Sequence, residues 1–191
     1  GILTDDNGNF LTDSRWNANE PTDFLHLKSQ AYQVRYATAI GERITFDAGA
    51  RYFKATETQQ YHEPRGLVAG STDLVAREFR DQIRTQETWS FGANAVWTTD
   101  LSSSVRNRVL FGFDHFLSDS FFQGRSLRGT TVDTPGLPNP LSLFDPQYGL
   151  SDPATYNQGP FTTTLSESEQ TGFYLLDELT IGRLILTGGI R

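Results

Sequence analysis

The sequence of 191 residues contains no cysteine, so it has neither a disulfide framework nor a thiolate metal site. It contains no methionine, so we expect the chain to be processed or cut from a longer protein. No apolar run approaches the roughly 20 residues that a membrane-spanning helix needs. These absences exclude a helical membrane protein, but they leave open a protein that crosses a membrane with strands.

Positive charge is also scarce, with 16 basic against 23 acidic residues and a net charge of -7. No basic stripe occurs along the chain, which disfavours nucleic acid as a partner. Hydrophobic residues make up only 37% of the sequence, whereas aromatic residues reach 13%. The apolar surface is therefore concentrated in rings.

The clearest pattern is an alternation over residues 89–98, which predicts a strand with two unlike faces. The apolar set is Trp89, Phe91, Ala93, Ala95 and Trp97, and the interleaved, mostly polar set is Ser90, Gly92, Asn94, Val96 and Thr98. Two interpretations fit this pattern. The apolar face either packs on a soluble protein core, or it touches lipid while the other face lines a wet lumen.

The same alternation predicts strands over about 26–40, 43–60, 76–99, 108–122, 166–181 and from 184 onward. The connections between them are short at 41–42, 100–104 and 182–183, and long at 61–72 and 123–162, with a further loop at 1–23. Outer-membrane barrels have this rhythm of short periplasmic turns and long external loops, and a Greek-key sandwich does not. The predicted lumen face carries the charges Arg35, Asp47, Arg51, Asp114 and Glu178, which a dry core would not tolerate unpaired. We therefore predict an all-β, antiparallel, up-and-down transmembrane β-barrel segment of about six strands.

Aromatic residues at the ends of the apolar faces predict a lipid-facing girdle. These residues are Tyr32, Tyr36, Tyr52, Trp89 and Trp97. The eight steps from Trp89 to Trp97 cover roughly 26 Å along the strand. With the usual tilt this corresponds to about 20 Å of depth, close to the apolar band of a barrel, which is about 25 Å tall.

No catalytic or metal-binding constellation is visible, so we do not expect an enzyme. The three histidines, His26, His62 and His115, are far apart and lack partners at ligand spacing. We interpret His62 as a surface-loop histidine and His115 as part of the girdle.

Ligand recognition is the remaining functional candidate, because rings provide contact area at low entropic cost and arginines pair with anions. The candidates are Phe116, Phe121, Phe122, Phe144, Tyr148, Tyr156 and Phe161, with Arg125 and Arg128 as anion partners. The alternative is that these rings only pack the loops against their neighbours.

Five segments in order resemble the TonB-dependent siderophore receptors of the outer membrane. These are "GILTDDNGNFLTDSRWNANEPTDF" (1–24), "VLFGFDH" (109–115), "NPLSLFDPQYG" (139–149), "PFTTT" (160–164) and "QTGFYLLDELTIGRLILTGGIR" (170–191). In that family the corresponding patterns are a loop ending "GEPxxD", a strand "LLLGLDYQ", a loop "LFNPxYG", and "QTGxYxQDQ" followed by "LTLGGRYD". Nothing in the sequence resembles the plug domain or the TonB box of the family.

The resemblance implies part of a 22-stranded barrel around a plug, in the outer membrane of a Gram-negative bacterium. It implies a ferric siderophore as the transported ligand, no covalently bound cofactor, and contact with outer-membrane lipid and lipopolysaccharide. It also implies that the TonB–ExbB–ExbD complex acts through the plug. Two other classes remain open from the residues alone, a passive porin-like barrel and a soluble β-sandwich that binds carbohydrate.

Overall fold

The structure is a computed structural model that describes residues 4, 7–12 and 15–191. Six long strands make up most of it, and they are β1 (Phe24–Ile40), β2 (Ile44–Leu67), β3 (Leu74–Ser102), β4 (Val105–Gly129), β6 (Thr162–Ile181) and β7 (Leu184–Ile190). Between β4 and β6 lie the two-residue strand β5 (Leu141–Ser142) and the short 3-10 helix η1 (Pro153–Thr155). In the described part of the chain, no helix has the length and apolar character needed to cross a membrane.

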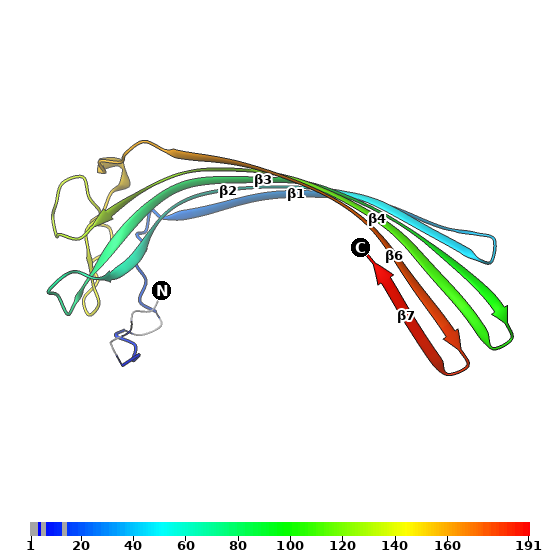
Figure 1. The fold of residues 1–191 in the computed structure, drawn as a ribbon. Coiled ribbons are helices and arrows are strands. Elements are labelled where there is room, and N and C mark those ends of the chain that lie inside the picture. Colours follow the sequence, from blue (N-terminus) through cyan, green and yellow to red (C-terminus); the bar gives the residue numbers. More distant parts are fainter. Residues whose placement is uncertain (1–3, 5–6, 13–14) are drawn as a thin grey trace. The chain divides into compact units, whose positions relative to one another are not determined.

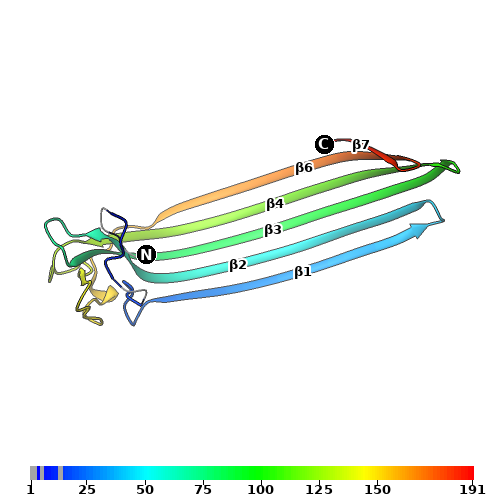
Figure 2. The same ribbon diagram turned by 90° about the horizontal axis from the view of Figure 1, so that it is seen from below.

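All strands join one sheet in the order β1-β2-β3-β4-β6-β7, with β5 paired to β3 (Figure 1). Strands that follow one another in the chain are neighbours in the sheet, apart from the short β5, and Figure 2 shows β1, β2, β3, β4 and β6 side by side in this order. The prediction of an all-β, antiparallel, up-and-down sheet is therefore confirmed. The sandwich interpretation is wrong, because it requires a second sheet and the described strands form one.

The chain divides into two units, which we describe separately. The loop unit consists of Gly1–Lys28, Thr56–Thr85 and Phe121–Thr164. The sheet unit consists of Ser29–Ala55, Gln86–Ser120 and Leu165–Arg191.

In the sheet unit, aromatic rings gather on one face of the strands and contact each other across them. Trp89 stacks on Phe91 with ring centroids 6.0 Å apart, and Tyr52 lies 4.7 Å from Trp89. Phe113 and Phe173 make a similar contact at 5.2 Å. No second layer built from the described residues covers these rings, and the exposed fractions of Trp89 and Phe91 are 42% and 37%.

The opposite face of the sheet unit is polar. The carboxylate of Asp47 lies 3.7 Å from the guanidinium of Arg35 and accepts a hydrogen bond from Asn94. Tyr174 donates its hydroxyl hydrogen to Asn94 Oδ1 at 2.6 Å. Charges and amides thus share the face that the alternation predicted to be wet.

The short connections are observed at 41–43, 103–104 and 182–183, so the one predicted over 100–104 is three residues shorter, and the long connections are shorter than predicted as well. The connection expected over 61–72 is reduced to 68–73, because β2 continues through Leu67 and β3 begins at Leu74. The connection expected over 123–162 is reduced to 130–161, because β4 extends to Gly129. The extra strand residues are stabilised by cross-strand pairs of polar side chains, such as Arg65 with Glu78 at 2.8 Å. Part of the loop predicted over 1–23 (residues 1–3, 5–6 and 13–14) lies outside the described residues.

Candidate functional site

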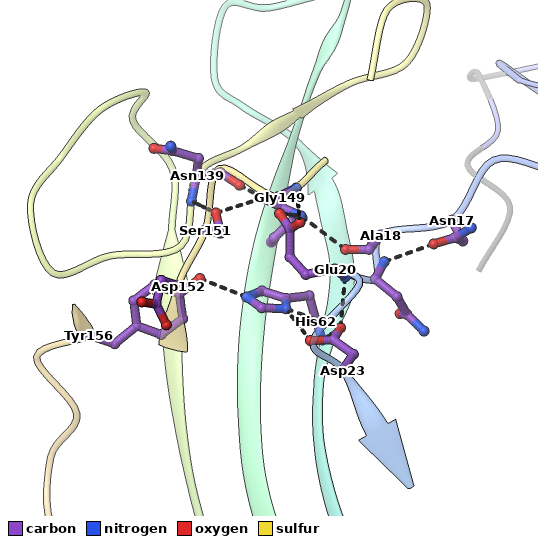
Figure 3. Close-up of polar contacts among 12 residues, drawn as sticks. Asn17, Ala18, Glu20, Asp23, His62, Asn139, Gly149, Ser151, Asp152 and Tyr156 are labelled. Atoms are coloured by element: carbon purple, nitrogen blue, oxygen red, sulfur yellow. Dashed lines mark hydrogen bonds and ion pairs between the residues drawn. The ribbon is translucent and has the colours of Figure 1, made fainter. Parts of the chain in front are cut away.

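Two segments of the loop unit meet at Arg77 of β3, whose side chain is fully buried. Its guanidinium donates hydrogen bonds to the carbonyl oxygens of Asn139 at 2.5 Å and Ala18 at 3.2 Å, and to Ser151 Oγ at 2.9 Å. It also makes an ion pair of 2.7 Å with Glu20 Oε1. One arginine therefore joins the segment before β1 to the long loop 130–161. Figure 3 labels its partners Ala18, Glu20, Asn139 and Ser151.

Glu20 is the counter-charge of Arg77 and is itself buried. Its Oε2 atom accepts a hydrogen bond from the backbone N–H of Gly149 at 2.5 Å, and its own N–H donates to Asp23 Oδ2 at 3.0 Å. Its Oε1 atom accepts no hydrogen bond from a described residue, so the contact with Arg77 is ionic. The stability of this buried carboxylate depends on the arginine, because an isolated charge is costly to bury.

His62 of β2 lies between an acid and a phenol, as Figure 3 shows. Its Nδ1 atom is 2.8 Å from Asp23 Oδ1, and its Nε2 atom is 2.8 Å from the hydroxyl of Tyr156. Its backbone N–H also donates to Asp23, and its ring packs against Phe79 with centroids 5.1 Å apart. The interpretation of His62 as a surface-loop histidine is wrong, since it lies in a strand with an exposed fraction of 1%.

The hydrogen bonds of this cluster are donated in one direction, from Tyr156 to His62 and from His62 to Asp23. Burial raises the pKa of Tyr156 to about 12, with a hydrogen bond from Ser151 acting in the opposite sense, so the phenol stays protonated. The phenol then donates to His62 Nε2, which leaves the Nδ1 hydrogen to donate to Asp23. Together with the pair of Glu20 and Arg77 these contacts close a ring, which we call the buried ring: Arg77, Ser151, Tyr156, His62, Asp23 and Glu20.

The buried ring is suited to holding segments in place rather than to catalysis. All six of its side chains are buried, so a substrate has no access to the histidine. The part of the chain that the structure describes contains no group of three or more His, Cys, Asp or Glu side chains able to hold a metal ion. Four of the six links instead connect residues far apart in the sequence, as in the Tyr156–His62 bond.

Further contacts dock the loop 130–161 beside the buried ring. Strand β5 pairs with the start of β3, with Val75 opposite Leu141. Asp73 accepts hydrogen bonds from Ser142 Oγ at 2.7 Å and from the N–H of Leu143 at 2.9 Å. At Gly129 a Cβ atom would lie 1.7 Å from the carbonyl oxygen of Pro138, so only glycine permits this approach. Leu141, Leu143, Val75 and Phe79 form the apolar part of the same interior.

The predicted ligand-binding residues fall into three groups by exposure. Phe144 (72% exposed), Tyr148, Phe161 and Arg128 are exposed; Phe116, Phe121, Phe122 and Arg125 are half-buried; and Tyr156 is buried. Phe116 belongs to the sheet unit and the other eight to the loop unit. Tyr156 belongs to the buried ring, so for this residue the packing alternative describes its contacts. For the other eight, contact with a ligand stays a prediction.

The two predicted anion partners differ in how far their charge is already neutralised. Arg125 donates to Asp81 at 2.7 Å and lies over the ring of Phe161, 4.1 Å from its centroid. Arg128 donates to the backbone carbonyl of Arg65 at 3.1 Å, and no carboxylate of a described residue lies within ion-pair distance of it. Arg128 is the better placed of the two to meet an external anion.

A half-buried lattice of alternating charges lies next to Arg128, where Arg65 and Arg80 each pair with Glu63 and with Glu78. Burial acts to raise the pKa of Glu78, but the hydrogen bond from Arg65 and the charges of both arginines outweigh it. The pKa of Glu78 is therefore lowered. The lattice keeps its arginines oriented and keeps Glu78 ionised.

The predicted girdle residues, all of which belong to the sheet unit, keep exposed or half-buried side chains. Tyr32, Tyr36, Trp89 and Trp97 are exposed and Tyr52 is half-buried, with Tyr32 and Tyr52 stacked at 6.2 Å. His115, also expected in the girdle, lies 6.2 Å from Phe91 in the same aromatic cluster.

Sequence reasoning missed the buried ring because its members are scattered polar residues with no common spacing. The residues around Arg77 and Ser151 in the sequence do not indicate that these two belong to a site. Glu20 did have a local signal, since Glu20 and Pro21 match the "EP" of the "GEPxxD" pattern that the opening segment resembles, but Asp23 comes one position before the Asp of that pattern.

One uncovered sheet with aromatic rings on one face and charged groups on the other is the wall of a transmembrane β-barrel, in which lipid and lumen take the two sides. The sequence matches the family described as "TonB dependent receptor-like, beta-barrel" over residues 1–191, and the chain belongs to this family. It is a family of receptors and transporters of the Gram-negative outer membrane, not of enzymes. None of the curated proteins compared with the chain matches it significantly.

Proposed function

We propose that this chain forms wall and vestibule of an outer-membrane TonB-dependent receptor that binds and imports ferric siderophores. Family membership supports the receptor class, and the resemblance of five ordered segments to siderophore receptors supports the ligand class. The sheet unit supplies the wall, with lipid and lipopolysaccharide against its rings. The loop unit supplies part of the vestibule.

The observation that carries the ligand assignment is the exposed surface of the loop unit. Phe144, Tyr148 and Phe161 present rings, and Arg128 presents a guanidinium without a carboxylate partner among the described residues. A ferric chelate is bulky and commonly anionic, so it gains contact area from the rings and charge complementarity from the arginine. A passive pore needs neither.

Import by this class is mechanical rather than chemical. The ligand binds from outside, and the TonB–ExbB–ExbD complex pulls on the plug of the receptor. The chain needs no bound cofactor for this role, because the iron arrives within the transported ligand.

The test is uptake of radioactive iron by a Gram-negative host that lacks its own siderophore receptors and expresses the intact protein. Three probes are used: a ferric catecholate, a ferric hydroxamate and a ferric carboxylate siderophore. We expect uptake of at least one probe, and loss of that uptake when TonB is deleted. Uptake that continues without TonB identifies a passive pore, and uptake of none of the three overturns the siderophore assignment.

Two variants test whether the exposed surface of the loop unit takes part in uptake. We expect Arg128→Gln and Phe144→Ala to raise the half-saturating concentration of the imported probe. Arg106→Gln is the matched control, because Arg106 is an equally exposed arginine at the short turn between β3 and β4, where it pairs with Asp100. An equal effect of all three variants contradicts the placement of the vestibule.

A further inference from the structure

From the buried ring we infer that the loop 130–161 is folded onto the strands before any ligand arrives, and that the six ring residues are positioning residues for the vestibule. The claim that these residues position a vestibule rests on the proposed function, whereas the folded state of the loop does not depend on it. Loops of this length are usually functional or disordered, so a fixed one requires an identifiable cause.

The first argument is how completely the polar groups are satisfied. Arg77 donates to three oxygens and pairs with Glu20, while Ser151 Oγ accepts from Arg77 and from the N–H of Asn139. Such a network is favourable only when every member is in place, because each missing partner leaves a buried polar group unpaired. Opening the loop removes several partners at once, so the loop either docks completely or leaves buried charges behind.

The second argument is the distance in sequence that the ring spans. The Tyr156–His62 bond joins residues 94 positions apart, and the bond from Gly149 to Glu20 joins residues 129 positions apart. Both ends of the segment that carries Phe144 and Tyr148 are therefore tied, at Asn139 through Arg77 and at Gly149 through Glu20. The exposed rings project from a segment whose backbone is fixed by residues outside it.

A fixed loop changes what ligand binding costs. A binding surface that is ordered beforehand avoids the entropy of ordering at the moment of association. The positioning residues thus act on affinity through Phe144 and Tyr148 without touching the ligand themselves.

The test is hydrogen exchange of the intact receptor in detergent micelles, with no ligand added. In the wild type we expect the amides of 139–156 to be protected. Glu20→Gln removes the charge that Arg77 requires and nearly preserves shape, so we expect exchange of 139–156 to rise by about tenfold or more. Tyr156→Phe keeps the ring and removes only the hydroxyl link to His62, so we expect a rise of about threefold to tenfold.

Tyr148→Phe is the matched control, because it is the same substitution in the same loop and breaks an exposed hydrogen bond from Tyr148 to the carbonyl of Asn17. We expect exchange within about twofold of the wild type for this variant. Amides of the β6–β7 hairpin serve as the internal reference and are expected to stay unchanged in all variants. Unprotected amides at 139–156 in the wild type, or protection that survives both Glu20→Gln and Tyr156→Phe, overturn the inference.

A second readout separates positioning from general stability. With the siderophore probe taken up in the uptake assay, Tyr156→Phe is expected to raise the half-saturating concentration and leave the maximal uptake rate unchanged. A lower maximal rate with an unchanged half-saturating concentration contradicts the positioning role. Because the exchange experiment uses no ligand, it still decides the state of the loop if the siderophore assignment fails.

Discussion

The loop unit and the sheet unit share most of the long strands, yet the two units differ in which side chains are buried and which are exposed. Every buried hydrophobic side chain of the described residues lies in the loop unit, and so do the buried polar ones such as Arg77 and His62. The sheet unit has large rings on its surface, with Trp97 49% exposed. The loop unit thus contains its own interior, whereas the sheet unit has an apolar face that no described part of the chain covers.

This difference identifies the environment of each unit. Burial of polar groups is tolerated in the loop unit because each finds a partner, as it must when water is excluded. A continuous apolar face over several strands is stable only against another apolar phase, and for a member of this barrel family that phase is lipid. The following predictions test this contrast, from the largest expected effect to the smallest.

Replacing Arg77 by methionine should have the largest effect. Arg77→Met leaves Glu20 buried without its counter-charge, which destabilises the docked loop by about 3–5 kcal/mol. Limited proteolysis of the intact receptor should then cut within 130–161, where the wild type is resistant. Arg80→Met is the control: Arg80 is half-buried in the charge lattice, and this change should leave 130–161 resistant. Equal resistance of Arg77→Met and the wild type would show that the ring does not hold the loop.

A charge on the apolar face of the sheet unit should lower the stability somewhat less than the loss of Arg77 does. Phe91→Arg places a guanidinium against hydrocarbon and is expected to lower the free energy of unfolding in lipid vesicles by about 2–4 kcal/mol. Ser90→Arg puts the same side chain on the adjacent residue but on the polar face, which already carries charges of both signs such as Arg35 and Asp47. We expect that variant to be nearly neutral. If the two arginines have equal effects, the two faces do not differ in environment.

Adding a methyl group at Gly112 should lower the stability of the receptor by a moderate amount. A Cβ atom at this position would lie 2.0 Å from the ring of Tyr174, which covers the glycine from the neighbouring strand. Gly112→Ala should therefore destabilise the refolded receptor by about 1–3 kcal/mol in thermal unfolding, as overpacking usually does. The double variant Gly112→Ala with Tyr174→Ala removes the obstructing ring, so it should lose less than the sum of the two single changes. Strict additivity would exclude the contact.

Acidification should have the smallest effect, and in the loop unit it should act through Glu78. The pKa of Glu78 in the folded state lies below its ordinary value of 4.5, so ionised Glu78 stabilises the fold above that pH. That contribution is lost as the pH falls from 4.5 through the folded pKa. Hydrogen exchange of 61–80 measured from neutral to acid pH should accelerate in this range, and Glu78→Gln should flatten the dependence. Glu169→Gln is the control, since Glu169 is an exposed residue of the sheet unit.

Sequence patterning predicted the sheet unit well because each of its residues obeys a local rule. Alternation over Trp89–Trp97 assigns each residue to a face, and Gly41 and Gly182 at the tight turns adopt positive φ angles of 66° and 60°. Asp177 interrupts the alternation of β6, because it shares a face with Leu175 and Leu179. The structure shows a regular register there, with Asp177 opposite Gly188 and hydrogen-bonded to Asn107.

The loop unit was predicted less well, since its polar residues look like turn residues until their partners are known. Residues 61–67 contain His62, Pro64 and Gly66, which locally indicate a connection, yet they belong to β2. Tyr156 was expected at the vestibule surface because it is a ring in a long loop. It lies in the interior because His62 and Ser151 bond to its hydroxyl.

The sequence by itself determined the six main strands, though not the two-residue β5, together with the two faces and the short turns, because a period of two and a glycine at a turn act over neighbouring residues. Only the tertiary structure decided that Arg77, Glu20, His62 and Tyr156 form one buried ring, since charge pairing depends on distance in space and not on spacing along the chain. The same reason separates Arg128 from Arg125, which look alike in the sequence and differ because one of them has a carboxylate beside it.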